Sequence, residues 1–174
     1  MRQSFCHTVS ASLSRIVRTF CLQRHSLQSR IAAPRGENFV TRKIARAAAR
    51  IARNLDTELA LGNLESQRDW GRAQDYVQAM CLMLQHDTAD DYVVATGESH
   101  SVREFVEAAF AVVDLPWQKY VKHGLAFDRP TEPARLVGCS DKIRKTLGWK
   151  PRGTFRELVQ EMVEAELAAI DSRD

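Results

Sequence analysis

A break in composition near residue 36 confines any regular fold to the rest of the chain. Residues 1–36 contain six arginines and six serines but no lysine, and all 22 acidic residues of the chain come later. The hydrophobic pattern of this front part is irregular, whereas from Asn38 onward caps, periodic helices and short strands follow one another. We therefore divide the 174 residues into an aberrant, disordered segment, 1–34, and one domain, 35–174.

Hydrophobic periodicity predicts alternating helices and strands in the domain. Residues 40–53 form an amphipathic helix with an arginine-rich face, and residues 59–61 form a short strand before a turn at Gly62 and Asn63. A second helix over 73–85 precedes a buried strand over 92–95. We expect this second helix to bury Tyr76, Val77, Met80 and Leu84.

Capping residues mark three further helices. Ser101 and Glu104 have the spacing of a capping box, as do Thr154 and Glu157, which predicts helices running to about residues 113 and 170. Ser140 is placed to cap a shorter helix that ends near Gly148. The succession of elements is that of an α/β protein.

Composition excludes several classes of function. No apolar run is long enough to cross a bilayer, so we expect no membrane association. The net charge of +3 does not favour nucleic acid as a partner. The four cysteines and five histidines are scattered without metal-ligand spacing, so we assign no metal and expect a reducing, cytoplasmic location.

The signatures of a complete nicotinamide enzyme are missing from the sequence. It contains no G-x-G-x-x-G turn, no P-loop and no Tyr-x-x-x-Lys pair. Arg68 could grip a diphosphate, although a structural pair with Asp69 or another acid is an alternative. Arg129, presented by a proline-containing loop, is either a second candidate or a solvated arginine. We interpret the arginine-rich helix face as solvated and the tryptophans as packing residues.

Several short motifs follow one another over about residues 35–169. They are R-G-E-N-F-V-T-R-K from Arg35, L-G-N-L from Leu61, R-D-W-G from Arg68, A-T-G-E from Ala95, S-V-R-E-F from Ser101, R-P-T-E from Arg129 and L-G-W-K-P from Leu147. Together these motifs resemble the GDP-mannose 4,6-dehydratase family, a member of the extended short-chain dehydrogenase/reductase group.

The resemblance implies the C-terminal, substrate-binding portion of an extended Rossmann-type dehydratase, with an incomplete sheet and an irregular N-terminal arm. Full-length members use NADP(H) to oxidise the sugar at C4, eliminate water across C5 and C6 and return the hydride, which gives GDP-4-keto-6-deoxymannose on the way to GDP-fucose. Arg35 resembles a cofactor-contacting arginine of the family. Lys43, Arg68, Arg129 and Glu132 resemble positions of the substrate half. Oligomers are possible for the full-length family.

The chain also departs from the family pattern. The family usually has histidine where Arg72 stands and a basic residue where Gln74 stands, so the family's local contacts are not carried over to these two positions. Residues 1–34 match none of the family's cofactor-binding and catalytic segments. Back-translation of residues 1–35 with a shift of one nucleotide yields a family-like string, so frameshifted translation and a presequence are the two hypotheses for this segment.

We therefore expect a GDP-mannose 4,6-dehydratase fragment that carries substrate-binding residues but no catalytic residue, is inactive alone and does not hold NADP by itself. The alternatives are a non-catalytic nucleotide-sugar-binding protein and an organelle-targeted interaction protein. Since the helices should be amphipathic toward a nucleotide-binding half, we also expect exposed apolar patches and poor solubility.

Overall fold

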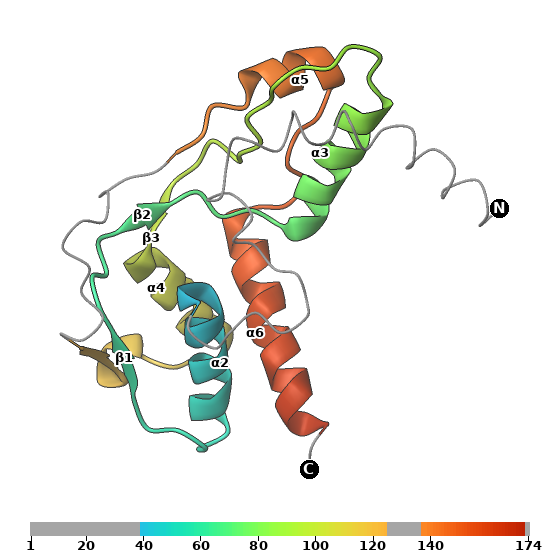
Figure 1. Ribbon diagram of the computed structural model, residues 1–174. Helices are drawn as coiled ribbons and strands as arrows, with labels where there is room; N and C mark the ends of the chain where they lie inside the picture. Colours follow the sequence, from blue (N-terminus) through green and yellow to red (C-terminus); the bar gives the residue numbers. More distant parts are fainter. Residues whose placement is uncertain (1–38, 125–136, 173–174) are drawn as a thin grey trace.

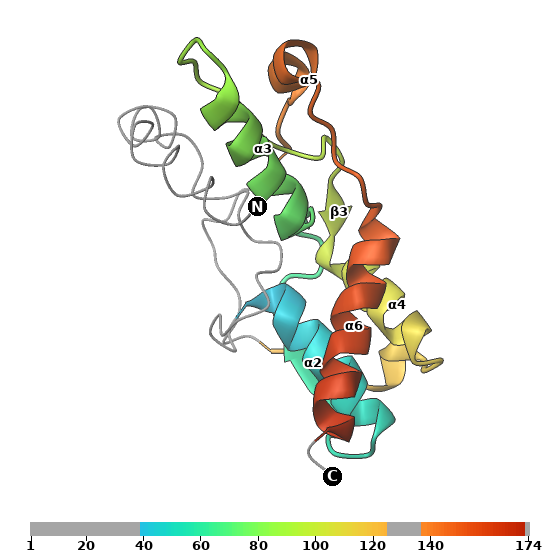
Figure 2. The ribbon, with the colours of Figure 1, turned by 90° about the vertical axis from the view of Figure 1, so that its right-hand side faces the viewer.

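A computed structural model describes residues 39–124 and 137–172 as a mixed α/β fold. Figures 1 and 2 show helices α2, α4 and α6 side by side in one part of the molecule, with α3 and α5 beyond one end of them. The helices are α2 (Val40–Ala52), α3 (Ala73–Gln85), α4 (Val102–Val112), α5 (Asp141–Leu147) and α6 (Phe155–Asp171), together with the 3-10 turn η1 (Trp117–Lys119).

Helices α2, α4 and α6 enclose the main core. This three-helix core contains 17 buried side chains. Four of them, Ile44, Phe105, Phe110 and Val163, are inaccessible to solvent. Both predicted capping boxes are present: the Ser101 and Thr154 side chains accept from the backbone N–H three residues on, and the glutamates there accept in return. The predicted helices 40–53, 101–113 and 154–170 are thus confirmed within two residues.

Four short strands form two separate sheets in the part of the chain that the structure describes. Strand β1 (Leu59–Leu61) pairs in parallel with β4 (Val121–His123), with Ala60 opposite Lys122. Strand β2 (Gln67–Arg68) pairs antiparallel with β3 (His100–Ser101). The predicted strand at 59–61 is therefore confirmed. Its parallel partner places the carboxyl ends of β1 and β4 at the same edge of their sheet.

Helices α3 and α5 pack around a much smaller cluster, which we call the small cluster. Its buried members are Ala79, Tyr92, Ile143 and Trp149. Helix α3 has the predicted bounds. Helix α5 ends at Leu147 and is followed by Gly148, whose φ of 65° suits a residue without a Cβ. The Ser140 side chain, however, makes no capping hydrogen bond.

Two predictions for this region are wrong. Residues 92–95 are not a strand, because no strand of the described chain lies beside them to supply ladder hydrogen bonds. Val77 is 51% exposed rather than buried, since α3 turns its other face, with Tyr76 and Ala79, toward the molecule. Met80 and Leu84 are half-buried.

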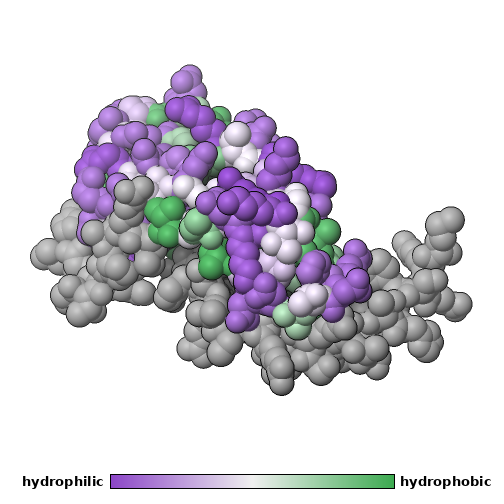
Figure 3. Space-filling view, turned by 90° about the horizontal axis from the view of Figure 1, so that it is seen from above, coloured by the Kyte–Doolittle hydropathy of each residue, from purple (hydrophilic) through white to green (hydrophobic). Residues whose placement is uncertain are grey.

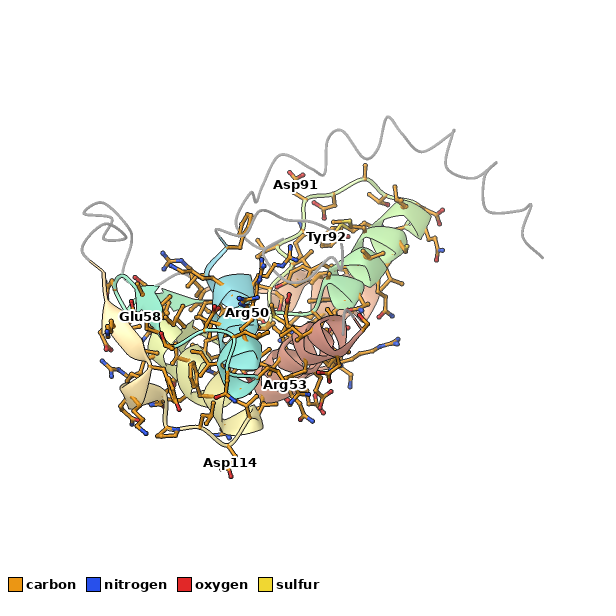
Figure 4. All side chains as sticks on the ribbon, turned by 90° about the horizontal axis from the view of Figure 1, so that it is seen from below. Arg50, Arg53, Glu58, Asp91, Tyr92 and Asp114 are labelled. Carbon is orange, nitrogen blue, oxygen red and sulfur yellow. The ribbon has the colours of Figure 1, made fainter. Side chains whose placement is uncertain are left out.

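Ion pairs neutralise much of the arginine-rich face of α2. Arg50 donates two hydrogen bonds to the Asp56 carboxylate at 2.6 and 2.9 Å, and Arg53 donates two to Asp171 at 2.8 and 2.7 Å. Arg42 meets Glu166 at 3.3 Å. Figure 4 labels Arg50 on α2 and Arg53, the residue that follows the helix. These contacts fit a solvated, ion-paired face.

Among the described helices none is long and apolar enough to span a bilayer.

Candidate functional site

Lys43 lies on α2 and reaches the first strand of the parallel pair. Its Nζ donates a hydrogen bond of 2.6 Å to the backbone carbonyl of Ala60 in β1. Partial burial lowers the pKa of this ammonium group because the charged form loses hydration. The side chain is therefore anchored beside β1 and is not extended freely into solvent.

Arg68 belongs to β2 and is held by the pairing of that strand with β3. In the register, Arg68 lies opposite His100, and Gln67 lies opposite Ser101. The half-buried Arg68 donates from Nη1 to the carbonyl oxygen of Gln67 at 2.7 Å. Because the pairing of β2 with β3 fixes the backbone of Arg68, its side chain extends from a fixed point of the structure.

Asp69, the next residue, organises a turn that is distant in sequence. Its Oδ1 accepts from the backbone N–H of Thr96 at 3.0 Å and from the Thr96 hydroxyl at 2.6 Å, and its Oδ2 accepts from the N–H of Gly97 at 3.0 Å. Arg144 adds a bond of 3.0 Å to the Thr96 carbonyl. The donors of these three bonds to Asp69 are Thr96 and Gly97. The Arg68–Asp69 pair considered from the sequence is therefore not among them.

Sequence reasoning missed this role of Asp69. The available signal was the pair of motifs R-D-W-G and A-T-G-E, because a carboxylate accepting from consecutive N–H groups needs a turn such as Thr96-Gly97. Gly97 has a φ of 87°, which favours glycine at this turn. Asp69 thus links the residues that precede α3 to the residues that precede β3.

Arg72, the position where the family usually has histidine, forms a structural contact. Its Nη2 lies 2.5 Å from a carboxylate oxygen of Glu161 and 3.7 Å from one of Glu157, both on α6. A Cβ at Gly153 would come within 2.4 Å of the guanidinium carbon, so the arginine also occupies the space beside that glycine. The ion pairs of Arg72 therefore link the start of α3 to the start of α6.

Three of the predicted site residues, Arg35, Arg129 and Glu132, lie outside the described residues, so their roles stay predictions. The described chain stops at Gly124, one residue after β4, and Arg129 and Glu132 follow in sequence. Of the five predicted residues, the structure therefore places Lys43 beside β1 and Arg68 on β2. It tests neither as a ligand contact.

The described residues do not fit a dinucleotide cofactor. A cradle for a pyrophosphate needs a glycine-rich turn between a strand and the N-terminus of a helix. Within residues 39–124 and 137–172, neither sheet has more than two strands, and the glycine spacing offers no such turn. The same residues contain no group of three His, Cys, Asp or Glu side chains that could hold a metal ion.

Comparison with known proteins points to one family. The family model described as GDP-mannose 4,6 dehydratase matches residues 21–162, a range that begins ahead of the predicted boundary at residue 34. GDP-mannose 4,6 dehydratase 1 of Arabidopsis thaliana is 53% identical over 133 residues, which are 76% of this chain and 37% of the relative. The human GDP-mannose 4,6 dehydratase is 46% identical over 150 residues, and the match covers 76% of this chain and 40% of that protein.

Solved structures agree on the fold. RMD from Pseudomonas aeruginosa, complexed with NADPH, superposes with a TM-score of 0.71 at 24% identity, covering 81% of this chain and 46% of that one. UDP-glucose 4-epimerase from Thermotoga maritima, with UDP-glucose, gives a TM-score of 0.64 at 20% identity, covering 79% and 42%. The chain thus spans less than half the length of each of these proteins.

Proposed function

The chain belongs to the GDP-mannose 4,6-dehydratase family, and from this premise we propose that it supplies the part of the site that binds GDP-mannose. Lys43, Arg68, Arg129 and Glu132 are the proposed substrate-binding residues, and Arg35 is the proposed contact to NADP(H) in the longer family proteins. The proposed role is binding of the substrate of a dehydratase that forms GDP-4-keto-6-deoxymannose, without catalysis by this chain alone.

The main support for a substrate site is the parallel pairing of β1 with β4. Ligands of open α/β sheets bind outside the carboxyl ends of parallel strands. The chain leaves β1 at Leu61 toward Arg68, and it leaves β4 at His123 toward Arg129 and Glu132. Lys43 contacts Ala60 in β1 itself. Two segments with candidate residues therefore depart from the same edge, which supports a shared binding site.

The chemistry of the candidate residues suits a nucleoside diphosphate sugar. Arginine stays charged at physiological pH and offers parallel N–H donors that match two phosphate oxygens. A carboxylate such as Glu132 accepts hydrogen bonds from sugar hydroxyls. Lys43 offers three N–H donors, one of which is already given to Ala60. The set therefore provides donors for the diphosphate and an acceptor for the hexose.

The sequence supports binding without turnover. Proton transfer at the sugar requires an acid and a base held against the reacting carbons, and the chain has no Tyr-x-x-x-Lys pair. We therefore expect that the purified chain, incubated with GDP-mannose and NADP(H), forms no GDP-4-keto-6-deoxymannose detectable by mass spectrometry. Product formation at a steady rate would contradict this part of the proposal.

Calorimetric titration of GDP-mannose into the full chain tests the binding itself. We expect a saturable heat with the wild type and a Kd raised about tenfold or more in Arg68→Ala, since a charge-assisted bond to phosphate contributes about 1.5–3 kcal/mol. Arg68→Lys should lie between them, because it keeps the charge and loses the planar fork. GDP should compete for the site, whereas free mannose should not.

Arg103→Ala is the matched control for that titration. Arg103 is an exposed arginine that pairs with Glu65 at 2.5 Å and lies over the Trp117 ring. An exposed ion pair contributes little to stability, so this variant should fold and bind like the wild type. The absence of saturable heat for the wild type, or equal affinities for Arg68→Ala and Arg103→Ala, would refute the proposed function.

A further inference from the structure

The strand that carries Arg68 has a short backbone ladder. Strands β2 and β3 contain two residues each, and a strand pair of this size is marginally stable by itself. On the N-terminal side of Arg68, a backbone bond continues the contact, since the N–H of Val102 donates to the Ser66 carbonyl at 3.1 Å. On the C-terminal side, the side chain of Asp69 continues it. Arg68 therefore lies between a backbone contact and a side-chain contact.

The carboxylate of Asp69 joins the two segments beyond the ladder. Its Oδ1 accepts from the N–H and the hydroxyl of Thr96, and its Oδ2 accepts from the N–H of Gly97. Three donors from two consecutive residues fix the position and the plane of the carboxylate. The Thr96 hydroxyl also accepts from the N–H of Glu98 at 3.2 Å. Asp69 thus holds the residues that lead into β3.

The bonds of Asp69 and the pairing of β2 with β3 close a ring of contacts around Arg68. In one direction, Arg68 lies opposite His100 in the register. In the other direction, the chain passes from Arg68 to Asp69, across the hydrogen bonds to Thr96, and along residues 97–99 back to His100. The backbone of Arg68 therefore cannot shift without disturbing either the ladder or the bonds of Asp69.

Gly71 and Tyr76 pack against Thr96. A Cβ at Gly71 would lie 2.8 Å from Thr96 Cγ2 and 2.9 Å from the Tyr76 hydroxyl, so the glycine leaves room for both side chains. Tyr76 is 2% exposed, and its burial, followed by the charges of Asp69 and Asp75, raises the pKa of its phenol well above the ordinary value. Hydrogen bonds and packing together hold Thr96, which offers Asp69 a fixed set of donors.

The turn at Thr96 and Gly97 lies at a polar surface. Gly97 and Glu98 are exposed, and Arg144 of α5 donates to the Thr96 carbonyl at 3.0 Å. Figure 3 views the molecule from the end where α5 lies, and hydrophilic side chains cover more of its coloured surface than apolar ones. Water competes with neutral hydrogen bonds at such a surface, whereas bonds to a charged group are about twice as strong. A carboxylate at position 69 is therefore suited to hold this turn.

We propose that Asp69 is a positioning residue for Arg68 in the binding of GDP-mannose, an inference that rests on the proposed function. Asp69 acts through Arg68 and does not touch the substrate, because its carboxylate is engaged by Thr96 and Gly97. It fixes the backbone from which the Arg68 side chain extends. The guanidinium then meets the diphosphate with less conformational freedom left to lose on binding.

A double-mutant cycle tests this role by calorimetric titration of GDP-mannose into the full chain. Asp69→Asn keeps one oxygen for Thr96 but presents an amide NH2 group to the N–H of Gly97, which places donor against donor. We expect it to raise the Kd about tenfold in the wild-type background. In the Arg68→Ala background its effect should stay below about twofold, because a residue that acts through Arg68 has nothing left to position.

Thr96 and Asp75 provide the conservative variant and the control. Thr96→Val removes the hydroxyl donor and should raise the Kd about threefold, whereas Thr96→Ser keeps the donor and should bind like the wild type. Asp75→Asn is the matched control, because Asp75 also accepts from a distant backbone N–H, that of Arg152 at 3.1 Å, but lies outside the ring around Arg68. Its Kd should stay within about twofold of the wild-type value.

Hydrogen exchange provides a readout that needs no ligand. In Asp69→Asn the amides of Thr96 and Gly97 should exchange about tenfold faster, while those of α2 and α6 stay unchanged and show that the variant is folded. Unchanged exchange at these two amides would overturn the inference.

Two further results would overturn the inference and leave the proposed function intact. One is a Kd of Asp69→Asn equal to that of the wild type or of Asp75→Asn. The other is an undiminished effect of Asp69→Asn in the Arg68→Ala background. Absence of saturable heat with the wild type is a different outcome, because it would refute the proposed function and the inference with it.

Discussion

Around α2, α4 and α6, 17 buried side chains form one cluster, whereas α3, α5 and the segment 92–95 share a cluster of four. Ser101 and Thr154 complete capping boxes at the starts of α4 and α6. Within the described chain, buried polar atoms without a hydrogen-bond partner occur in both regions: Trp70 Nε1 in the three-helix core, and the Tyr76 and Tyr92 hydroxyls near α3. The two regions therefore differ in the size of their apolar cores rather than in how completely their polar groups are paired.

The difference lies in how each helix obtains its neighbours. Helices α2, α4 and α6 pack on one another, so each buries its apolar stripe against elements of the same chain. Helix α3 has two apolar faces, and the small cluster covers one of them. The ion pair between Arg72 and Glu161 and the bonds of Asp75 hold α3 in place without covering its second face.

The largest expected effect is that of Phe105→Ala in the three-helix core. Phe105 is inaccessible to solvent and meets the ring of Trp70 at 5.3 Å and that of Phe155 at 5.8 Å. Removing such a side chain costs about 3–5 kcal/mol, so urea denaturation should show a large loss of stability. Val112→Ala on the same helix, at a position 36% exposed, should change it by less than about 0.5 kcal/mol. Equal losses would contradict the assignment of the core.

A smaller and more local effect is expected for Trp149→Phe in the small cluster. The substitution removes the donor to the buried carbonyl of Asp75, which costs about 1–3 kcal/mol. We expect amide exchange of α3 and α5 to accelerate while that of α2 and α6 stays unchanged. If exchange in α2 and α6 accelerated to the same degree, the two regions would unfold as one unit and the comparison would fail.

The smallest effects concern acid sensitivity, for which one carboxylate from each region is compared. Hydrogen bonds from Arg53 lower the pKa of Asp171, and one from Lys142 lowers the pKa of Asp90. A carboxyl group whose pKa is lower in the folded state stabilises the fold above its unfolded pKa, and this contribution is lost as the pH falls through the folded pKa. Stability should therefore decrease on acidification below about pH 4.

Asn substitutions separate the two regions in that experiment. Asp171→Asn should weaken the decrease of the global Tm between neutral and acid pH, because Asp171 joins α6 to α2. Asp90→Asn should leave the global Tm curve unchanged and speed exchange in α5, where Lys142 lies. An equal effect of both variants on the global Tm would argue against a separate α3–α5 region.

Sequence reasoning located the helices well because their signals are local. The spacing of Ser101 from Glu104 and of Thr154 from Glu157 specifies a helix start through backbone N–H groups three residues away. Residues 92–95 have the composition of a buried strand, yet a strand requires a partner from elsewhere, which no local pattern supplies. The exposure of Val77 was missed for the same reason, since a helix with two apolar faces does not reveal which one is covered.

The candidate site was predictable only in part. Family motifs selected Lys43 and Arg68, but the contacts that hold them, with Ala60 and Gln67, depend on strands that are brought together by the fold. The role of Asp69 at the 96–97 turn and the contact of Arg72 with Glu161 span 27 and 89 positions of sequence and carry no periodic signal. Such long-range polar contacts follow from packing rather than from local spacing.

Site-resolved hydrogen exchange on the full chain tests the contrast between the two regions most directly. Amides of α2, α4 and α6 should exchange only through global unfolding, whereas those of α3, α5 and residues 93–95 should exchange at least tenfold faster through local opening. Uniform protection across α2, α3, α4, α5 and α6 would contradict the account, because it would mean that α3 and α5 are as completely packed as the three-helix core.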